Sequence, residues 1–199
     1  MDRNSGIDGN SKSEGESAKK TSLHAHTKRR GLLIFCPHRI AKSVTEIDPA
    51  QLKEQGIQGV ILDLDNTLVK WAQEDLSEEV TAWVQSLRDN NLKFCLLSNS
   101  VISKRVDRVA EKFGCINIRK ARKPSRDGFN RAMKAMSSAA QTTAIIGDQM
   151  FTDIWGGNRV GIYTIMVQPM SKGEFIYTRY VSRPPERLLI RYFKKRGHL

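Results

Sequence analysis

Residues 59–69 of the 199-residue chain read GVILDLDNTLV, and the predicted fold is built around these residues. Residues 60–62 form a short apolar run rich in β-branched side chains, which is typical of a strand buried on both faces of a parallel sheet. Two carboxylates, those of Asp63 and Asp65, follow this run. Burying carboxylates is costly unless they bind a cation or take part in chemistry. Because ligands of open α/β sheets bind at the carboxyl ends of strands, Asp63 and Asp65 are candidate functional residues.

Polar residues follow two other predicted strands in the same way. The apolar run of residues 92–97 is followed by Ser98 and Asn99, and the run of residues 143–146 is followed by Gly147 and then Asp148. Alone, each of these motifs is also compatible with an ordinary polar turn. Together they indicate that several functional side chains meet at one edge of a sheet.

Strands and helices are predicted to alternate along most of the chain. Strands are expected at residues 60–62, 92–97, 115–118, 143–146 and 161–167. Helices are expected at residues 49–55, 77–90, 103–113, 125–137 and 152–158, with Asp48 and Ser77 as N-caps of the first two. This alternation predicts an α/β fold, a Rossmann-like three-layer αβα sandwich around a central parallel sheet.

The composition limits the environment and the partners of the protein. A formal net charge of +12 and a pI near 9.8 favour an anionic partner, such as nucleic acid, an acidic membrane surface or a phosphorylated substrate. Three scattered cysteines, Cys36, Cys95 and Cys115, lack a C-x-x-C spacing and indicate free thiols in the cytoplasm. No apolar run approaches the ~20 residues that span a bilayer.

The chain divides into three predicted parts. Residues 1–30 are rich in small polar residues and predict a disordered basic tail, residues 31–170 form the folded domain, and residues 171–199 form a basic amphipathic segment. In this segment, a helix from Pro184 is expected to gather apolar residues on one face and cations on another. These are Leu188, Leu189, Tyr192 and Phe193, and Arg187, Arg191, Lys194 and Lys195. The apolar face either docks on the domain or lies on an anionic membrane.

The residues at the strand ends are suited to phosphate chemistry with a metal ion. Asp63, the backbone carbonyl of Asp65 and Asp148 can supply the hard oxygen ligands that Mg²⁺ prefers. Lys123, which precedes a predicted helix, can bind phosphoryl oxygens together with the polar residues after the second strand, Ser98 and Asn99.

This ordered set resembles the haloacid dehalogenase superfamily of phosphotransferases. The resemblance is carried by D-x-D-x-T at residues 63–67, Ser98, Lys123 and G-D-x-x-x-x-D at residues 147–153. The short spacer at residues 68–77 leaves no room for a cap domain after the first motif, and neither does the spacing from Ser98 to Lys123. The chain therefore resembles the capless subclass IIIA of that superfamily.

A finer resemblance includes the upstream segment. Residues 37–47 match P-x-x-I-x-x-S-V-x-E-I, and together with the stretch at residues 59–69 they resemble the YqeG-like phosphatases, which are related to phosphatidylglycerophosphatases. This resemblance implies a phosphomonoester hydrolase with phosphatidylglycerophosphate as its substrate.

The superfamily resemblance also implies a role for each motif residue. Asp63 would be the nucleophile that forms an aspartyl-phosphate. Asp65 would be the general acid and base. Asp148 would bind Mg²⁺, Asp153 would hold the water shell of the metal, and Thr67 would fix the loop that positions Asp65.

The sequence also fits other functions. The substrate can instead be soluble, either a sugar phosphate or a phosphoprotein. A different class of function is an RNA-associated or ribosome-associated binding protein built on the same scaffold, which the high pI favours. A lipid substrate predicts a cytoplasmic protein with a peripheral contact on the inner face of an anionic membrane.

Overall fold

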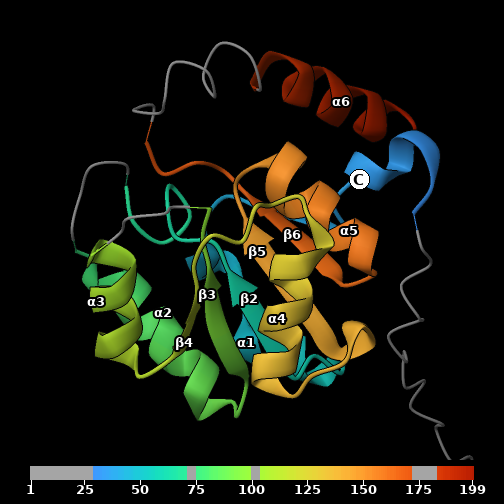
Figure 1. Ribbon diagram of the computed structural model, residues 1–199. Coiled ribbons are helices and arrows are strands. Elements are labelled where there is room, and N and C mark those ends of the chain that lie inside the picture. The colour runs from blue at the N-terminus through green and yellow to red at the C-terminus, as the bar shows by residue number, and fades with distance from the viewer. Residues whose placement is uncertain (1–28, 71–74, 100–103, 172–182) are drawn as a thin grey trace, which may run out of the picture.

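The computed structural model describes residues 29–70, 75–99, 104–171 and 183–199. In this part of the chain, six strands form one sheet in the order β1-β6-β5-β2-β3-β4 (Figure 1). They are β1 (Arg39–Ala41), β2 (Gly59–Leu62), β3 (Lys93–Leu97), β4 (Ile116–Ile118), β5 (Thr143–Gly147) and β6 (Tyr163–Val167). All neighbouring strands are parallel, which confirms the predicted Rossmann-like α/β fold.

Helices connect the strands, as the sequence predicts. The α-helices are α1 (Pro49–Glu54), α2 (Glu78–Asp89), α3 (Lys104–Phe113), α4 (Arg126–Met136), α5 (Trp155–Val160) and α6 (Arg183–Lys195). Shorter turns are the 3₁₀ helices η1 (Gly31–Phe35), η2 (Val44–Glu46) and η3 (Ala140–Thr142), and the π-helical η4 (Met150–Ile154). Both predicted caps are present, because the side chains of Asp48 and Ser77 accept hydrogen bonds from the first turns of α1 and α2.

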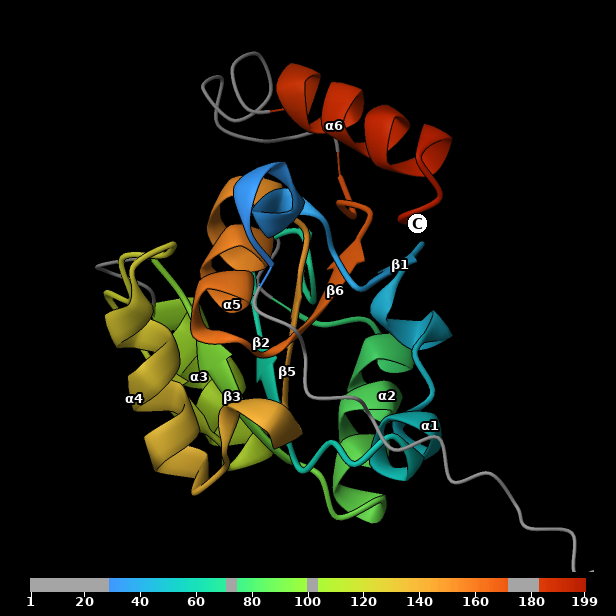
Figure 2. The same cartoon turned by 90° about the vertical axis from the view of Figure 1, so that its right-hand side faces the viewer.

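The sheet is the middle of three layers. Along β2, Val60 and Leu62 pack with α1, α2 and α3, whereas Ile61 packs with α4 on the opposite face. Figure 2 shows α1 and α2 on one side of the sheet and α4 and α5 on the other. This arrangement buries β2 completely, so that the two aspartates after it enter the site from the centre of the sheet.

Two elements differ from the expectation. β1 was not predicted, because it is a three-residue strand at the edge of the sheet, and only its last residue, Ala41, is buried. The helix expected at residues 152–158 starts earlier and in another form, as η4, and continues as α5. The cysteines Cys36, Cys95 and Cys115 are free thiols, as predicted.

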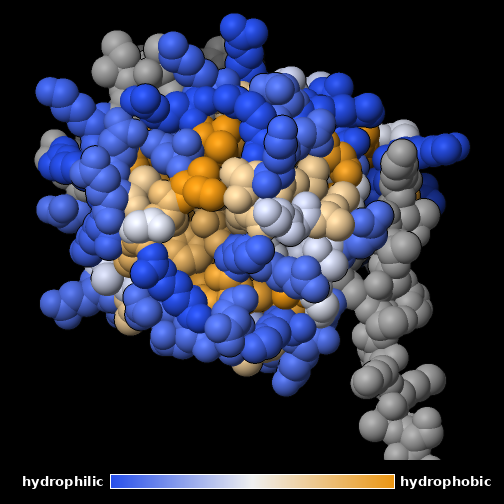
Figure 3. All heavy atoms as spheres, turned by 60° about the horizontal axis from the view of Figure 1, so that its bottom comes forward, coloured by the Kyte–Doolittle hydropathy of each residue, from blue (hydrophilic) through white to orange (hydrophobic). Residues whose placement is uncertain are grey.

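Helix α6 begins at Arg183 and packs on the domain. Phe193 is fully buried, and Leu189 and Ile190 pack against Met150, Ile154 and Met166. Leu188 and Tyr192 are 64% and 43% exposed, so the predicted apolar face is divided between the core and the surface. The lower face of the molecule, away from α6, presents a separate apolar patch ringed by hydrophilic side chains (Figure 3).

The predicted basic tail at residues 1–30 lies outside the described residues except for Arg29 and Arg30. None of the helices in the described ranges combines the length and hydrophobicity that crossing a bilayer requires.

Candidate active site

The turn after β2 directs two polar side chains toward the centre of the site. The Asp63 amide continues the sheet with a hydrogen bond to the carbonyl of Ile146 at 3.0 Å. The amides of residues 67–69 then donate hydrogen bonds to the carbonyl of Leu64. Asn66, inside this turn, adopts the left-handed conformation that Asn tolerates. The hydroxyl of Thr67 then donates to Asp63 Oδ2 at 3.2 Å.

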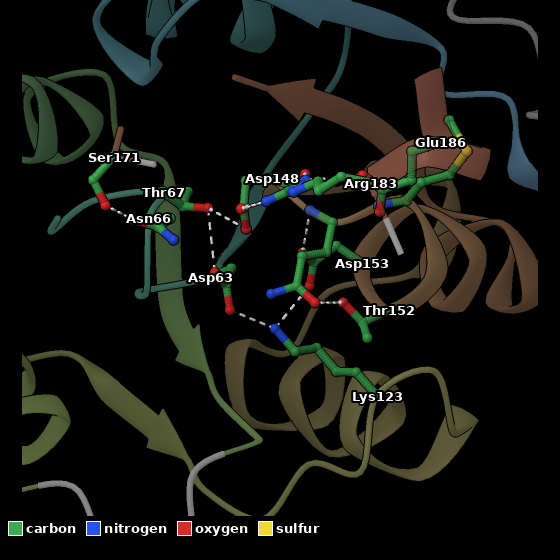
Figure 4. Close-up of polar contacts among 12 residues, drawn as sticks. Asp63, Asn66, Thr67, Lys123, Asp148, Thr152, Asp153, Ser171, Arg183 and Glu186 are labelled. Atoms are coloured by element: carbon green, nitrogen blue, oxygen red, sulfur yellow. Dashed lines mark hydrogen bonds and ion pairs between the residues drawn. The ribbon is translucent and has the colours of Figure 1, made fainter. Parts of the chain in front are cut away.

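A second carboxylate enters from β5. Asp148 is fully buried, and its Oδ1 lies 3.5 Å from the Thr67 hydroxyl. Gly147, just before it, leaves room for Asp153, since a Cβ atom at this position would lie 2.4 Å from the Asp153 carboxylate carbon. Carboxylate oxygens of Asp63, Asp148 and Asp153 all lie within 4.8 Å of one another (Figure 4).

Lys123 supplies the positive charge between two of these carboxylates. Its Nζ lies 2.5 Å from Asp63 Oδ1 and 2.7 Å from Asp153 Oδ1, and its side chain is almost fully buried. Lys123 lies in the loop before α4 and is held by Asn99, which follows β3 and whose Oδ1 accepts from the Lys123 amide at 2.6 Å. The Asn99 Nδ2 donates to the Lys123 carbonyl at 3.1 Å. Both ends of the Asn99 amide therefore contact the backbone of Lys123, and its predicted contact with phosphate stays a prediction.

The remaining predicted residues lie at the same edge of the sheet. Ser98 is buried at the end of β3, where its amide bonds to the Ile118 carbonyl and its carbonyl accepts from the Ala121 amide, both at 3.0 Å. Asp65 is half-buried in the turn after β2. The structure thus brings Asp63, Thr67, Lys123, Asp148 and Asp153 together, while the chemical roles of Ser98 and Asp65 stay predictions.

Two further site residues come from α6 and were missed by the sequence analysis. Arg183 donates to the Oδ2 atom of Asp148, to the Asp148 carbonyl at 2.7 Å and to Glu186 Oε2 at 2.9 Å. Glu186 is 2% exposed, and its Oε1 accepts from the Met150 amide at 3.1 Å. Glu186 is the only acidic residue of α6, which is the one signal in the sequence that sets it apart from the basic face.

Burial and neighbouring charges shift the pKa values of three site residues. Burial raises the pKa of Asp63 to about 6 against the opposing charge of Lys123. It also raises the pKa of Asp148 well above its ordinary value, assisted by Asp63 and opposed by Arg183. For Lys123, burial lowers the pKa, but the charges of Asp153 and Asp63 outweigh it and raise the pKa overall.

The charges of the site are unbalanced in a way that fits a divalent cation. Four carboxylates, those of Asp63, Asp148, Asp153 and Glu186, contact two cations, those of Lys123 and Arg183. Two negative charges are left over when all are ionised, which disfavours the buried site unless a cation binds. Oxygen donors of this type are the ligands that Mg²⁺ prefers. Asp63 and Asp148, which follow the neighbouring strands β2 and β5, are the candidate ligands that the sequence predicts, and an Asp153 oxygen lies within 4.8 Å of theirs.

The connections around the site are short. The segment between β2 and α2 spans residues 63–77, and the segment between β3 and α3 spans residues 98–103. Neither is long enough to form a cap domain, so the site lies at an edge of the sheet that is not covered by an inserted domain.

Comparisons with known proteins agree with this geometry. The sequence profile of haloacid dehalogenase-like hydrolases matches residues 69–161. The probable phosphatase YqeG of Bacillus subtilis is 36% identical over 165 residues, which cover 83% of this chain and 95% of that protein.

More distant relatives carry a specific substrate in their names. Phosphatidylglycerophosphate phosphatase 1 of Chlamydomonas reinhardtii is 28% identical, with 68% of this chain and 53% of that protein covered. The protein of that name in Arabidopsis thaliana is 29% identical, with 80% of this chain and 48% of that protein covered. Over a shared length this large, the identity to YqeG is decisive: the chain belongs to the haloacid dehalogenase family of hydrolases and is a phosphatase.

Proposed function

We propose that this phosphatase is a Mg²⁺-dependent phosphomonoester hydrolase that works through an aspartyl-phosphate on Asp63. The observation that carries the proposal is the position of the Asp63 carboxylate, which lies 2.5 Å from Lys123 Nζ and is grouped with the Asp148 carboxylate. An anionic nucleophile can approach a phosphate dianion only where positive charge neutralises both. Lys123 supplies one such charge, and Mg²⁺ held by Asp63, Asp148 and the Asp65 carbonyl would supply the rest.

The proposed reaction has two displacements at phosphorus. In the first, an Asp63 oxygen bonds to phosphorus while the bond to the leaving alcohol breaks, and Asp65 gives a proton to the leaving oxygen. In the second, Asp65 takes a proton from water, the water oxygen bonds to phosphorus, and the bond to Asp63 breaks. Inorganic phosphate leaves and both aspartates return to their starting states.

The residues around the nucleophile support the transferred group. Lys123 and Ser98 are proposed to bind the phosphoryl oxygens, because both are buried at the carboxyl end of the sheet, where Lys123 contacts Asp63 and Ser98 follows β3, the neighbour of β2. Asn99 supports this arrangement by holding the Lys123 backbone. Asp153 keeps Lys123 charged and close to Asp63, and Thr67 orients the Asp63 carboxylate.

We propose that the substrate is phosphatidylglycerophosphate. Two relatives are named for that activity, and a site without a cap domain admits a large phosphorylated head group. A lipid substrate also suits the surface of α6, where Leu188 and Tyr192 are exposed next to cations. These cations are Arg187, Arg191, Lys194, Lys195 and Arg196. The protein would then be cytoplasmic and would contact the inner face of an anionic membrane through this helix.

A panel of phosphate esters tests the function and the substrate together. Hydrolysis of p-nitrophenyl phosphate with Mg²⁺, and its loss in EDTA, supports the general reaction; full activity in EDTA contradicts the metal requirement. Phosphatidylglycerophosphate in mixed micelles is expected to give the highest kcat/KM. Higher values for sugar phosphates or phosphopeptides would point to a soluble substrate. Sedimentation with ribosomes and no hydrolysis of any ester would favour an RNA-associated binding protein instead.

A further inference from the structure

We propose that Arg183 and Glu186 are a positioning pair that orients Asp148 for cation binding. Helix α6 then contributes two residues that act on the site through Asp148. This inference rests on the proposed function, because it assigns the pair to the Mg²⁺ site described above. Neither residue belongs to the strand-end motifs, and both come from a helix that the sequence analysis treated as a tail.

Arg183 fixes Asp148 through both its side chain and its backbone. One guanidinium nitrogen donates to Asp148 Oδ2, and the other donates to the Asp148 carbonyl at 2.7 Å (Figure 4). A planar fork with two such contacts restrains the rotation of the carboxylate as well as the course of the peptide. The other oxygen, Oδ1, is left facing Thr67 on the side of Asp63. Contacts of this kind behind a metal ligand set the direction in which its binding oxygen points.

Glu186 makes the presence of a cationic side chain compatible with a cation site. Its Oε2 accepts from Arg183 at 2.9 Å, so the negative charge of Glu186 offsets the guanidinium charge and weakens its repulsion of a metal ion. Its Oε1 accepts from the Met150 amide, at the start of the η4 turn that also carries Asp153. The pair therefore connects the segments that hold Asp148 and Asp153.

The remainder of α6 keeps this pair in place. Phe193, ten residues after Arg183 and thus about 15 Å along the helix, is fully buried. Leu189 and Ile190 pack on the same cluster that contains Met150. These apolar contacts dock the second half of α6 on the domain, and the helix carries Arg183 from there into the site.

The charge of Arg183 and the hydrogen-bond geometry of its guanidinium can be tested separately. Arg183→Lys keeps the charge but cannot make all three contacts, and Arg183→Gln with Glu186→Gln removes both charges without changing the sum. Arg88→Gln is the matched control, because Arg88 is exposed near the end of α2, a helix that contributes no residue to the site. Calorimetry measures the dissociation constant for Mg²⁺ in each full-length variant, and p-nitrophenyl phosphate assays measure kcat at rising Mg²⁺.

We expect both Arg183 variants to bind Mg²⁺ about 10- to 100-fold more weakly, the usual cost of removing a contact behind a metal ligand. Their kcat is expected to recover toward the wild-type value as Mg²⁺ approaches saturation, whereas Arg88→Gln is expected to keep the wild-type Mg²⁺ affinity and kcat. A purely structural role would lower the melting temperature without shifting the Mg²⁺ dependence. If the double variant does not fold, Arg183→Lys and Glu186→Gln, measured in the same way, decide the question.

Two results would overturn the inference while leaving the proposed function intact. Unchanged Mg²⁺ affinity in the folded variants would show that the pair only holds the helix. Tighter Mg²⁺ binding would show that Arg183 competes with the cation for Asp148. If wild-type protein neither binds Mg²⁺ nor hydrolyses the ester, the proposed function itself is wrong.

Discussion

The site has two halves that the chain builds in different ways. In the strand-end half, Asp63 and Asp148 directly follow the buried strands β2 and β5. The pairing of these two strands therefore fixes the positions of both aspartates. In the helix half, Arg183 contacts Asp148 from 35 residues further along the chain, and Glu186 contacts Arg183. Their position depends on the docking of α6 through Phe193. The first half can form with the core of the sheet, whereas the second requires a completed tertiary structure.

This difference predicts different functional roles for the two halves of the site. Groups that react must be held to within fractions of an ångström, and a central sheet provides that rigidity. Groups that adjust a metal ligand can come from an added element, because their effect passes through another residue. Substitutions in the strand-end half should therefore abolish turnover. Those in the helix half should change the Mg²⁺ concentration that turnover requires.

The largest effect is expected for Asp63→Asn. An amide has nearly the shape of the carboxylate but cannot form the aspartyl-phosphate, so kcat should fall on the order of 10⁴-fold or more while the protein still unfolds cooperatively. Steady-state hydrolysis of p-nitrophenyl phosphate and a thermal melt measure both quantities. Asp127→Asn, at an exposed carboxylate of α4, is the control and should keep full activity. Turnover near the wild-type rate would remove Asp63 as the nucleophile.

Lys123→Met should show the next largest effect, on stability as well as on activity. It leaves the carboxylates of Asp63 and Asp153 buried without their shared cation, which costs about 3–5 kcal/mol for a broken buried pair. Urea unfolding in EDTA measures this loss. Arg119→Met removes an exposed ion pair with Asp107 and should cost only about 0–1 kcal/mol. Equal losses in the two variants would mean that Lys123 is not held as a buried ion pair.

These expectations also mark what the sequence can reveal. The strand-end half was predictable because its signals are local: an apolar run, then carboxylates, at several points along the chain. The docking of Asn99 on the Lys123 backbone was not, since it depends on how two loops pack. Arg183 was missed for the same reason, because a basic residue at the start of a basic helix has no local feature that distinguishes it. β1 escaped prediction because three residues at a sheet edge carry no periodic pattern.

The effect of Mg²⁺ on stability should depend on pH. In the metal-free protein, the pKa of Asp63 is about 6 instead of 3.8, so the folded state binds the proton more tightly than the unfolded state does. This contribution to stability is fully present below pH 3.8 and is lost as the pH rises to about 6. Asp148 shifts in the same direction. Because protons and Mg²⁺ compete for these carboxylates, Mg²⁺ should stabilise the protein more at neutral than at acidic pH.

Thermal melts with and without Mg²⁺ at pH 7.5 and pH 5 measure this competition. The increase in melting temperature should be larger at pH 7.5 by several degrees, since each kcal/mol corresponds to about 2–4 °C in a chain of this size. Asp63→Asn should reduce the difference between the two pH values. An equal Mg²⁺ effect at both pH values would indicate that the cation binds elsewhere.

The smallest effect is expected for membrane binding by the exposed surface of α6, which contributes no charge to the site. Its only carboxylate is buried at Glu186, so the exposed side carries cations around Leu188 and Tyr192. Each cation near an anionic membrane contributes about 1 kcal/mol, so Arg191→Gln with Lys195→Gln should weaken binding to anionic vesicles about thirtyfold. Hydrolysis of p-nitrophenyl phosphate should not change. Vesicle co-sedimentation at two salt concentrations measures the binding, which salt should weaken because exposed charges are screened within ~8–10 Å at 0.1–0.15 M.

The control for this prediction is a second pair of exposed cations, Lys53→Gln with Lys93→Gln, which removes the same charge from other elements. Point substitutions are better suited than deleting α6, because the helix also buries Phe193 and carries Arg183 into the site. The lower face has an apolar patch of its own (Figure 3), so vesicle binding by itself does not identify the contact surface. If both pairs weaken binding equally, the attraction comes from the net charge of +12 rather than from α6. A loss confined to the α6 pair places the membrane at the helix that also orients Asp148, which would bring a lipid phosphate and the catalytic carboxylates to the same end of the molecule.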